Sequence, residues 1–88
     1  MTVRFYGEIE RLYTKSDGCS IRLQNVTPTG IVMPRDGYFH LDLNHENYAA
    51  LYSLALLAAS GRHRLSIRTT DDAVPTSPAN VQYLVLDW

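Results

Sequence analysis

Hydrophobic and polar side chains alternate along much of this chain, with the period of strands that bury one face. The pattern predicts main strands at residues 2–13, 19–25, 38–43, 64–69 and 81–88. In the third of them, Phe39, Leu41 and Leu43 share one side of the strand. A further short edge strand is predicted at residues 31–33. The chain is therefore expected to be mainly β.

Two glycine positions indicate how the first strands are shaped and joined. Gly7 interrupts the first strand and predicts a bulge or a sharp bend, which small barrels use to curl a strand. Asp17 and Gly18 predict a tight turn before the second strand, because Asp bonds to its local backbone and Gly tolerates positive φ.

A helix is predicted at residues 46–60, where polar residues are few. Asn44 is the expected N-cap, with its side chain accepting a hydrogen bond from a free amide of the first turn. Glu46 then lies where a carboxylate favours the positive end of the helix. Gly61 is expected to end the helix in the left-handed conformation.

The helix is apolar on almost all sides, which a helix lying on one barrel does not require. One explanation is a tight core that covers most of it. The other, which we favour, is contact with a second subunit, because a large exposed apolar patch is a liability. Strand 81–88 is also apolar on both faces, so it is either central in the sheet or part of an interface. The residues expected at a subunit interface are Tyr52, Leu56, Leu84, Leu86 and Trp88.

Length and composition limit the classes of protein to consider. The 88 residues predict one domain, and domains of this size usually gain stability from disulfides, a metal or self-association. Cys19 is the single cysteine, which excludes an internal disulfide and fits a reducing compartment. We find no apolar run long enough to span a bilayer and no export signal, so we expect a cytoplasmic protein unless such a signal has been removed. The net charge of −1 lacks the basic surplus typical of nucleic-acid-binding proteins.

His40, Asp42 and His45 are the nearest approach to a metal-binding set. His45 begins the predicted helix and need not converge with the other two, and no HExxH motif or paired cysteine is present. A catalytic group of Cys19, His40 and Asp42 is not expected, because Cys19 is in phase with buried apolar residues and a catalytic cysteine needs an exposed, electropositive site. We therefore expect no metal, no cofactor and no enzymatic activity.

The predicted order, β-β-β-α-β-β, resembles the oligosaccharide/oligonucleotide-binding (OB) fold, a small antiparallel barrel. Residues 47–61 followed by 65–68 are similar to a helix–glycine–strand unit of the ring-forming binding subunits of multimeric bacterial toxins and their small relatives. This resemblance covers residues 38–69. It implies a homo-oligomeric ring, often a pentamer, whose helices line the centre and which binds cell-surface glycans. The chain lacks the disulfide and export signal usual in that family, which weighs against a toxin role more than against a ring.

We expect a homo-oligomeric binding or scaffolding module for a glycan or another small polar ligand, without membrane insertion. One alternative is a single-stranded nucleic-acid binder with aromatic residues beside a basic groove. Glu8, Glu10 and Asp42 in the same region argue against it. The other alternative is a protein-interaction module, such as an immunity or inhibitor protein. The candidate ligand-binding residues are Tyr13, Arg22, Tyr38, His40 and Arg68.

Overall fold

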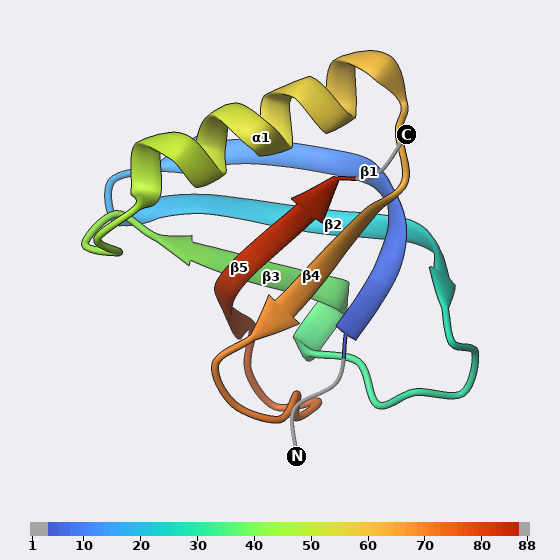
Figure 1. The fold of residues 1–88 in the computed structure, drawn as a ribbon. Helices are drawn as coiled ribbons and strands as arrows, with labels where there is room; N and C mark the ends of the chain where they lie inside the picture. Colours follow the sequence, from blue (N-terminus) through green and yellow to red (C-terminus); the bar gives the residue numbers. More distant parts are fainter. Residues whose placement is uncertain (1–3, 87–88) are drawn as a thin grey trace.

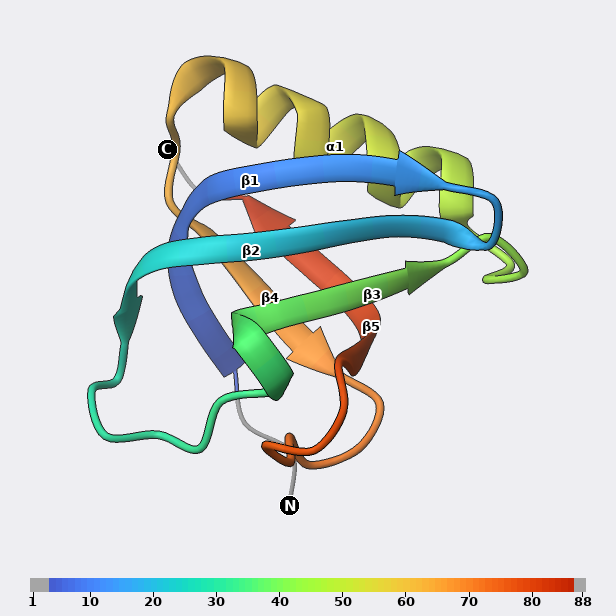
Figure 2. The same ribbon diagram turned by 180° about the vertical axis from the view of Figure 1, so that it is seen from behind.

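Across residues 4–86, which the computed structural model describes, five strands close into a barrel and one helix lies over its end (Figures 1 and 2). The elements are β1 (Arg4–Lys15), β2 (Gly18–Thr27), β3 (Tyr38–Asp42), α1 (Tyr48–Gly61), β4 (Leu65–Thr69) and β5 (Ala79–Leu86), with a short 3-10 turn at Arg35–Gly37. The predicted fold class, a small OB-like barrel of order β-β-β-α-β-β, is confirmed.

The strand order around the barrel is β1-β2-β3-β5-β4, so β1 pairs with β2 and with β4. One seam differs from the antiparallel pairing expected. β3 and β5 run parallel and are paired at Phe39–Ala79 and His40–Asn80. Farther along β5, a loop residue bonds to the strand: the Nε2 atom of His45 lies 3.0 Å from the carbonyl oxygen of Gln82.

β1 bends sharply and wraps around the barrel (Figure 2), as Gly7 predicts. The register with β2 shifts at Gly7, and a Cβ there would lie 2.8 Å from the backbone oxygen of Gln24. Because Gly7 has no side chain, β1 and β2 can approach each other closely at the bend. A second shift, between Ile9 and Arg11, leaves Glu10 as an extra residue on β1.

The barrel interior is filled by strands and helix together. Phe5 and Phe39 meet edge to face with ring centroids 5.0 Å apart. α1 buries Leu51, Ala55 and Ala58 against the end of the barrel. The remaining buried apolar residues are Cys19, Ile21, Leu23, Leu41, Leu65, Ile67, Ala79, Val81 and Leu84. The prediction that Cys19 is a small buried residue is confirmed.

The start of α1 differs from the prediction. The helix begins at Tyr48, with Asn47 as its N-cap residue. Asn44 belongs to the turn before it, where its amide donates to the Asp42 carboxylate over 2.8 Å. Glu46 therefore precedes the helix and does not lie in its first turn.

The end of α1 also differs, because Arg62 and not Gly61 adopts the left-handed conformation, with φ 53°. Gly61 instead lies against the ring of His63, which would have to move to make room for a Cβ at this position. Within the part of the chain that is described, no helix is long and apolar enough to cross a bilayer.

Two predicted strand positions lie in loops. Residues 31–33 form no strand in the described structure, although Ile31 and Met33 still pack against the core. Leu43 lies beyond the end of β3 and is exposed, because its amide turns to donate to the backbone oxygen of Asp17 over 2.9 Å. Residues 2–3 and 87–88 of the predicted end strands lie outside the described residues.

β5 contains an irregularity that alternation could not predict. Its pairing with β4 passes from Val81 to Tyr83 and leaves Gln82 as an extra residue. The alternation of inward and outward side chains shifts by one residue at this point, so that both Val81 and Leu84 are buried. This change of phase contributes to the apolar character of both sides of the strand.

Gly18, at the start of β2, has little room for a side chain. Its φ is +141°, and a Cβ there would overlap the carbonyl oxygen of Leu41. We expect Gly18→Ala to lower the free energy of unfolding by about 3 kcal/mol, from backbone strain together with the overlap. Urea denaturation followed by circular dichroism measures this loss.

Gly30→Ala is the matched control. Gly30 also has a positive φ, +76°, but no described atom lies within 4 Å of the added Cβ. Strain alone should therefore cost about 1–2 kcal/mol. Equal losses in the two variants would contradict the role assigned to close approach at Gly18.

Candidate functional site

The outward side of β1, β2 and β3 carries a group of aromatic and charged side chains, and Figure 2 views the barrel from this side. Strand register sets their positions, since Arg22 pairs with Arg11 on one side and with Tyr38 on the other. Tyr13 is two residues beyond Arg11 and faces the same way. We call Glu10, Arg11, Tyr13, Arg22 and Tyr38 the β1–β3 face. The fold thus brings together three of the candidate ligand-binding residues, Tyr13, Arg22 and Tyr38.

Tyr38 is the centre of this group. Its ring meets that of Tyr13 edge to face, with centroids 5.7 Å apart and planes at 81°. Its hydroxyl accepts a hydrogen bond from Nη1 of Arg11 over 3.2 Å. The guanidinium of Arg22 lies 5.8 Å from the ring centroid, within range of a cation–π contact. Nε of Arg22 is also 3.0 Å from a carboxylate oxygen of Glu10.

These contacts define the electrostatics of the β1–β3 face. The hydrogen bond from Arg11, with a smaller effect of Arg22, lowers the pKa of the Tyr38 hydroxyl. The same hydrogen bond raises the pKa of Arg11. Glu10 compensates the charge of Arg22, so the face offers donors, an acceptor and aromatic surface, with two arginines and one carboxylate. Tyr13 remains 42% exposed and is open to a ligand.

Glu10 and Arg11 complete the face, although the sequence-based prediction omits Arg11 and considers Glu10 only as a charge that argues against nucleic-acid binding. The signal for Arg11 is its spacing of two from Tyr13, which puts both on one side of a strand. The strand bulge at Glu10 shifts the alternation of inward and outward side chains between residues 9 and 11. The sequence around Glu10 gives no sign of this shift.

His40 continues the face along β3, where it pairs with Ser20 of β2. Its Nδ1 atom is buried and has no hydrogen-bond partner among the described residues. A shallow hollow of about 220 Å³ beside it is lined by Lys15, Asp17, His40, Pro78 and Asn80. His40 therefore borders the face and this hollow, although its Nδ1 atom is not accessible at the surface.

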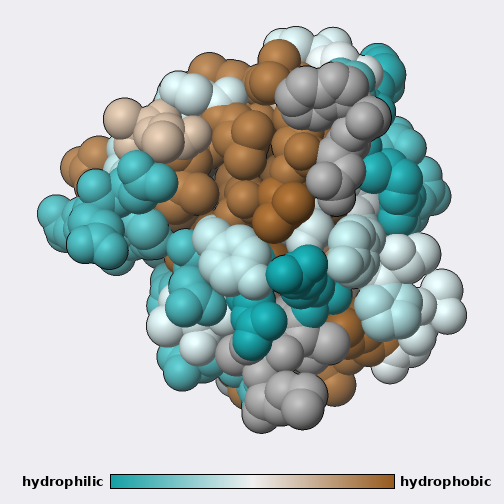
Figure 3. All heavy atoms as spheres, viewed as in Figure 1, coloured by the Kyte–Doolittle hydropathy of each residue, from teal (hydrophilic) through white to brown (hydrophobic). Residues whose placement is uncertain are grey.

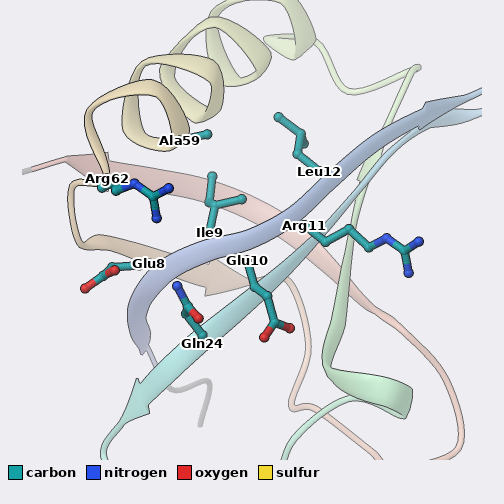
Figure 4. Close-up of a pocket in the computed structure, with 8 residues that line it drawn as sticks. All are labelled: Glu8, Ile9, Glu10, Arg11, Leu12, Gln24, Ala59 and Arg62. Carbon is teal, nitrogen blue, oxygen red and sulfur yellow. The ribbon is translucent and has the colours of Figure 1, made fainter.

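A larger hollow of about 330 Å³ runs along β1 beside the C-terminal end of α1 (Figure 4). Ile9, Leu12 and Ala59 point into the space between strand and helix, whereas Glu8 and Glu10 point to the other side of β1. The hollow is nevertheless bordered by both kinds of side chain, since Glu8, Glu10 and Arg62 line it together with the apolar residues.

Arg68, the remaining ligand candidate, lies on β4 and is not part of this group. Its strand neighbours are Arg4 and Tyr83. The closed barrel turns β4 away from β2 and β3, so Arg68 lies apart from the candidates Tyr13 and Tyr38, and its role as a ligand-binding residue stays a prediction.

The candidate interface residues differ in how much of each side chain is exposed. Leu56 is 43% exposed, whereas Tyr52 and Leu86 are partly buried against the core. Leu84 belongs to the core of the chain itself and has little surface to offer a partner. Trp88 lies outside the described residues. Figure 3 shows a continuous apolar surface over α1 and β5.

The histidines and the cysteine considered for metal binding or catalysis are separated by the fold. Asn47 donates its amide to Nδ1 of His45 over 3.0 Å, which leaves Nε2 to donate to a backbone carbonyl. Cys19 points into the barrel, on the opposite side of the sheet from His40, and burial raises the pKa of its thiol. No group of three His, Cys, Asp or Glu side chains within residues 4–86 is arranged to hold a metal ion.

The Tyr38 hydroxyl should ionise at a lower pH than an ordinary tyrosine, because Arg11 and Arg22 stabilise its phenolate. An NMR pH titration of tyrosine ring carbons measures this pKa. Arg11→Gln should raise the pKa of Tyr38 towards its usual value. Arg4→Gln, which removes an arginine from Tyr83 instead, is the control and should leave Tyr38 unchanged.

No protein-family model matches the chain, and no curated protein or solved structure matches it. The site on the β1–β3 face is therefore supported by its own geometry.

Proposed function

We propose that this chain is a non-enzymatic, self-associating binding module that holds a glycan or a similar small polar ligand on the β1–β3 face. The observation that carries this proposal is the contact of Tyr13 and Arg22 with Tyr38, with Glu10 compensating Arg22. The single, buried cysteine fits work in the cytoplasm, where thiols stay reduced.

The chemistry of this face fits a sugar. An exposed aromatic ring can lie against the apolar side of a sugar ring, while charged planar side chains bond to its hydroxyls. Tyr13 supplies such a ring, and Arg11, Arg22 and Glu10 supply donors and an acceptor. OB-type barrels bind oligosaccharides and oligonucleotides on the corresponding strands, so the location is also suitable.

A phosphate backbone fits this face less well. Nucleic-acid binding depends on cations that neutralise successive phosphates. Here Arg22 is paired with Glu10, and Lys15 lies 3.9 Å from a carboxylate oxygen of Asp17. Each of these pairs would have to be broken or shared before its cation could neutralise a phosphate.

Self-association is supported by the exposed apolar residues of α1. Leu56 is 43% and Leu57 50% exposed, on a helix with few polar residues. Leu54 lies on the same side as Leu57, because residues three apart share a helix face. Together with the apolar surface over β5 (Figure 3), they form a patch that a second copy would cover.

The ligand proposal predicts binding that depends on Tyr13 and is insensitive to salt. After a glycan array identifies a ligand, calorimetric titration should show Tyr13→Ala weakening it about tenfold, through loss of a ring contact and its neighbours. The affinity should change little between about 50 and 200 mM salt. Tyr6→Ala, an exposed tyrosine on another part of β1, is the control.

A different result would favour the nucleic-acid alternative. Binding of a single-stranded oligonucleotide that falls steeply with salt and disappears in Arg22→Ala would contradict the glycan proposal.

Light scattering at micromolar concentration should give several times the chain mass of 10.0 kDa. Leu56→Asp and Leu57→Asp should dissociate the assembly, because an unpaired charge in an apolar interface is costly. Val32→Asp is the matched control, since Val32 is 58% exposed but lies in a loop away from the helix. A monomer in the unsubstituted chain would contradict self-association.

A further inference from the structure

A second group of arginines and tyrosines lies on the outward side of β4 and its two neighbours, the side that faces the viewer in Figure 1. Arg68 of β4 pairs with Arg4 of β1 on one side and with Tyr83 of β5 on the other. Two residues earlier, Ser66 pairs with Tyr6 of β1. We call Arg4, Tyr6, Ser66, Arg68 and Tyr83 the β4 face.

The polar contacts on this face resemble those around Tyr38. Nη2 of Arg4 donates to the hydroxyl of Tyr83 over 3.1 Å, and its guanidinium lies 5.7 Å from the centre of that ring. The hydrogen bond from Arg4, with a smaller effect of Arg68, lowers the pKa of Tyr83. Because the hydroxyl accepts from Arg4, its own proton is free to be donated elsewhere.

The two faces are built alike but differ in one component. On each, two arginines occupy directly paired positions, Arg11 with Arg22 and Arg4 with Arg68. Like charges directly opposite one another destabilise a sheet. On the β1–β3 face Glu10 supplies the compensating carboxylate. On the β4 face, no carboxylate of residues 4–86 forms an ion pair with either arginine.

Ser66 gives an independent indication that a partner is missing. It is 3% exposed, and its Oγ atom has no hydrogen-bond partner in the described part of the chain. It is two residues from Arg68 and so belongs to the same outward side of β4. A buried hydroxyl without a partner is unfavourable, and most such groups in native proteins are satisfied.

We propose that the β4 face is a binding site for a compact oxyanion, namely the phosphate group of a small molecule. The guanidiniums of Arg4 and Arg68 would hold its oxygens, since arginine matches phosphate geometry through paired N–H donors. Tyr83 would donate its hydroxyl proton to the same group, whereas the Oγ atom of Ser66 is already covered by the protein and lies below the surface beside the site. The site lies apart from the β1–β3 face and does not depend on what that face binds.

The test is an NMR titration of the full chain with inorganic phosphate against a chloride control of equal ionic strength. Saturable shifts should occur at residues 4, 66, 68 and 83. Arg4→Gln and Arg68→Gln should each weaken binding by about tenfold or more, as expected for hydrogen bonds to a charged group. Tyr83→Phe should weaken it severalfold. Arg11→Gln, the matched arginine of the other face, should bind phosphate normally.

Further measurements distinguish a phosphate site from a sugar site and from a site occupied by a carboxylate of the chain itself. Glycerol phosphate should bind at least as well as inorganic phosphate, whereas an uncharged sugar should cause no shifts at these residues. The thermal midpoint should rise with phosphate in the unsubstituted chain and rise less in Arg68→Gln. Asp87→Asn, whose carboxylate lies outside the described residues, should not change phosphate affinity.

The proposal would be overturned by linear, unsaturable shifts, or by equal loss of binding in Arg11→Gln. It would also be overturned if Asp87→Asn strongly increased phosphate affinity, because the chain would then supply its own anion. None of these outcomes bears on glycan binding by Tyr13, so the two proposals fail separately.

Discussion

Every strand of a closed barrel pairs with two neighbours, and β1 reaches both of its neighbours by bending at Gly7. Its first residues pair with β4 and the remainder with β2. Gly7 permits this because a side chain there would meet the backbone of β2. The bend also divides the outward side of β1 between two surfaces, so that Arg4 and Arg11 contribute to different faces of one small molecule.

The same closure accounts for the weak seam of the barrel. β3 and β5 are paired over two positions, and His45 supplies a hydrogen bond to β5 beyond them. α1 covers one end of the barrel but buries small residues, Ala55 and Ala58, at its centre. Its leucines at 56 and 57 remain exposed. The chain therefore has an apolar surface beyond what its own core uses, which is why self-association is a reasonable proposal.

The two faces differ in whether a carboxylate pairs with one of their arginines. Each places two arginines side by side and directs one guanidinium at a tyrosine hydroxyl. This contact lowers the pKa of both Tyr38 and Tyr83 for the same physical reason. Glu10, present through a strand bulge, compensates one of the two arginines on the β1–β3 face. The difference in charge balance suggests a neutral ligand for one face and an anion for the other.

Residue types and their local spacing were enough to predict the element order, the bend at Gly7 and the burial of Cys19, because these depend on neighbouring residues in the sequence. The partners of each element were not predictable in this way. Strand bulges at Glu10 and Gln82 change the phase, and only pairing with a neighbouring strand reveals them. Arg68 and Tyr38 were both candidate ligand-binding residues, and only barrel closure shows that Arg68 lies beside Arg4 and Tyr83 instead. Side-chain type is a local property, whereas which side chains meet is decided by register and closure of the whole sheet.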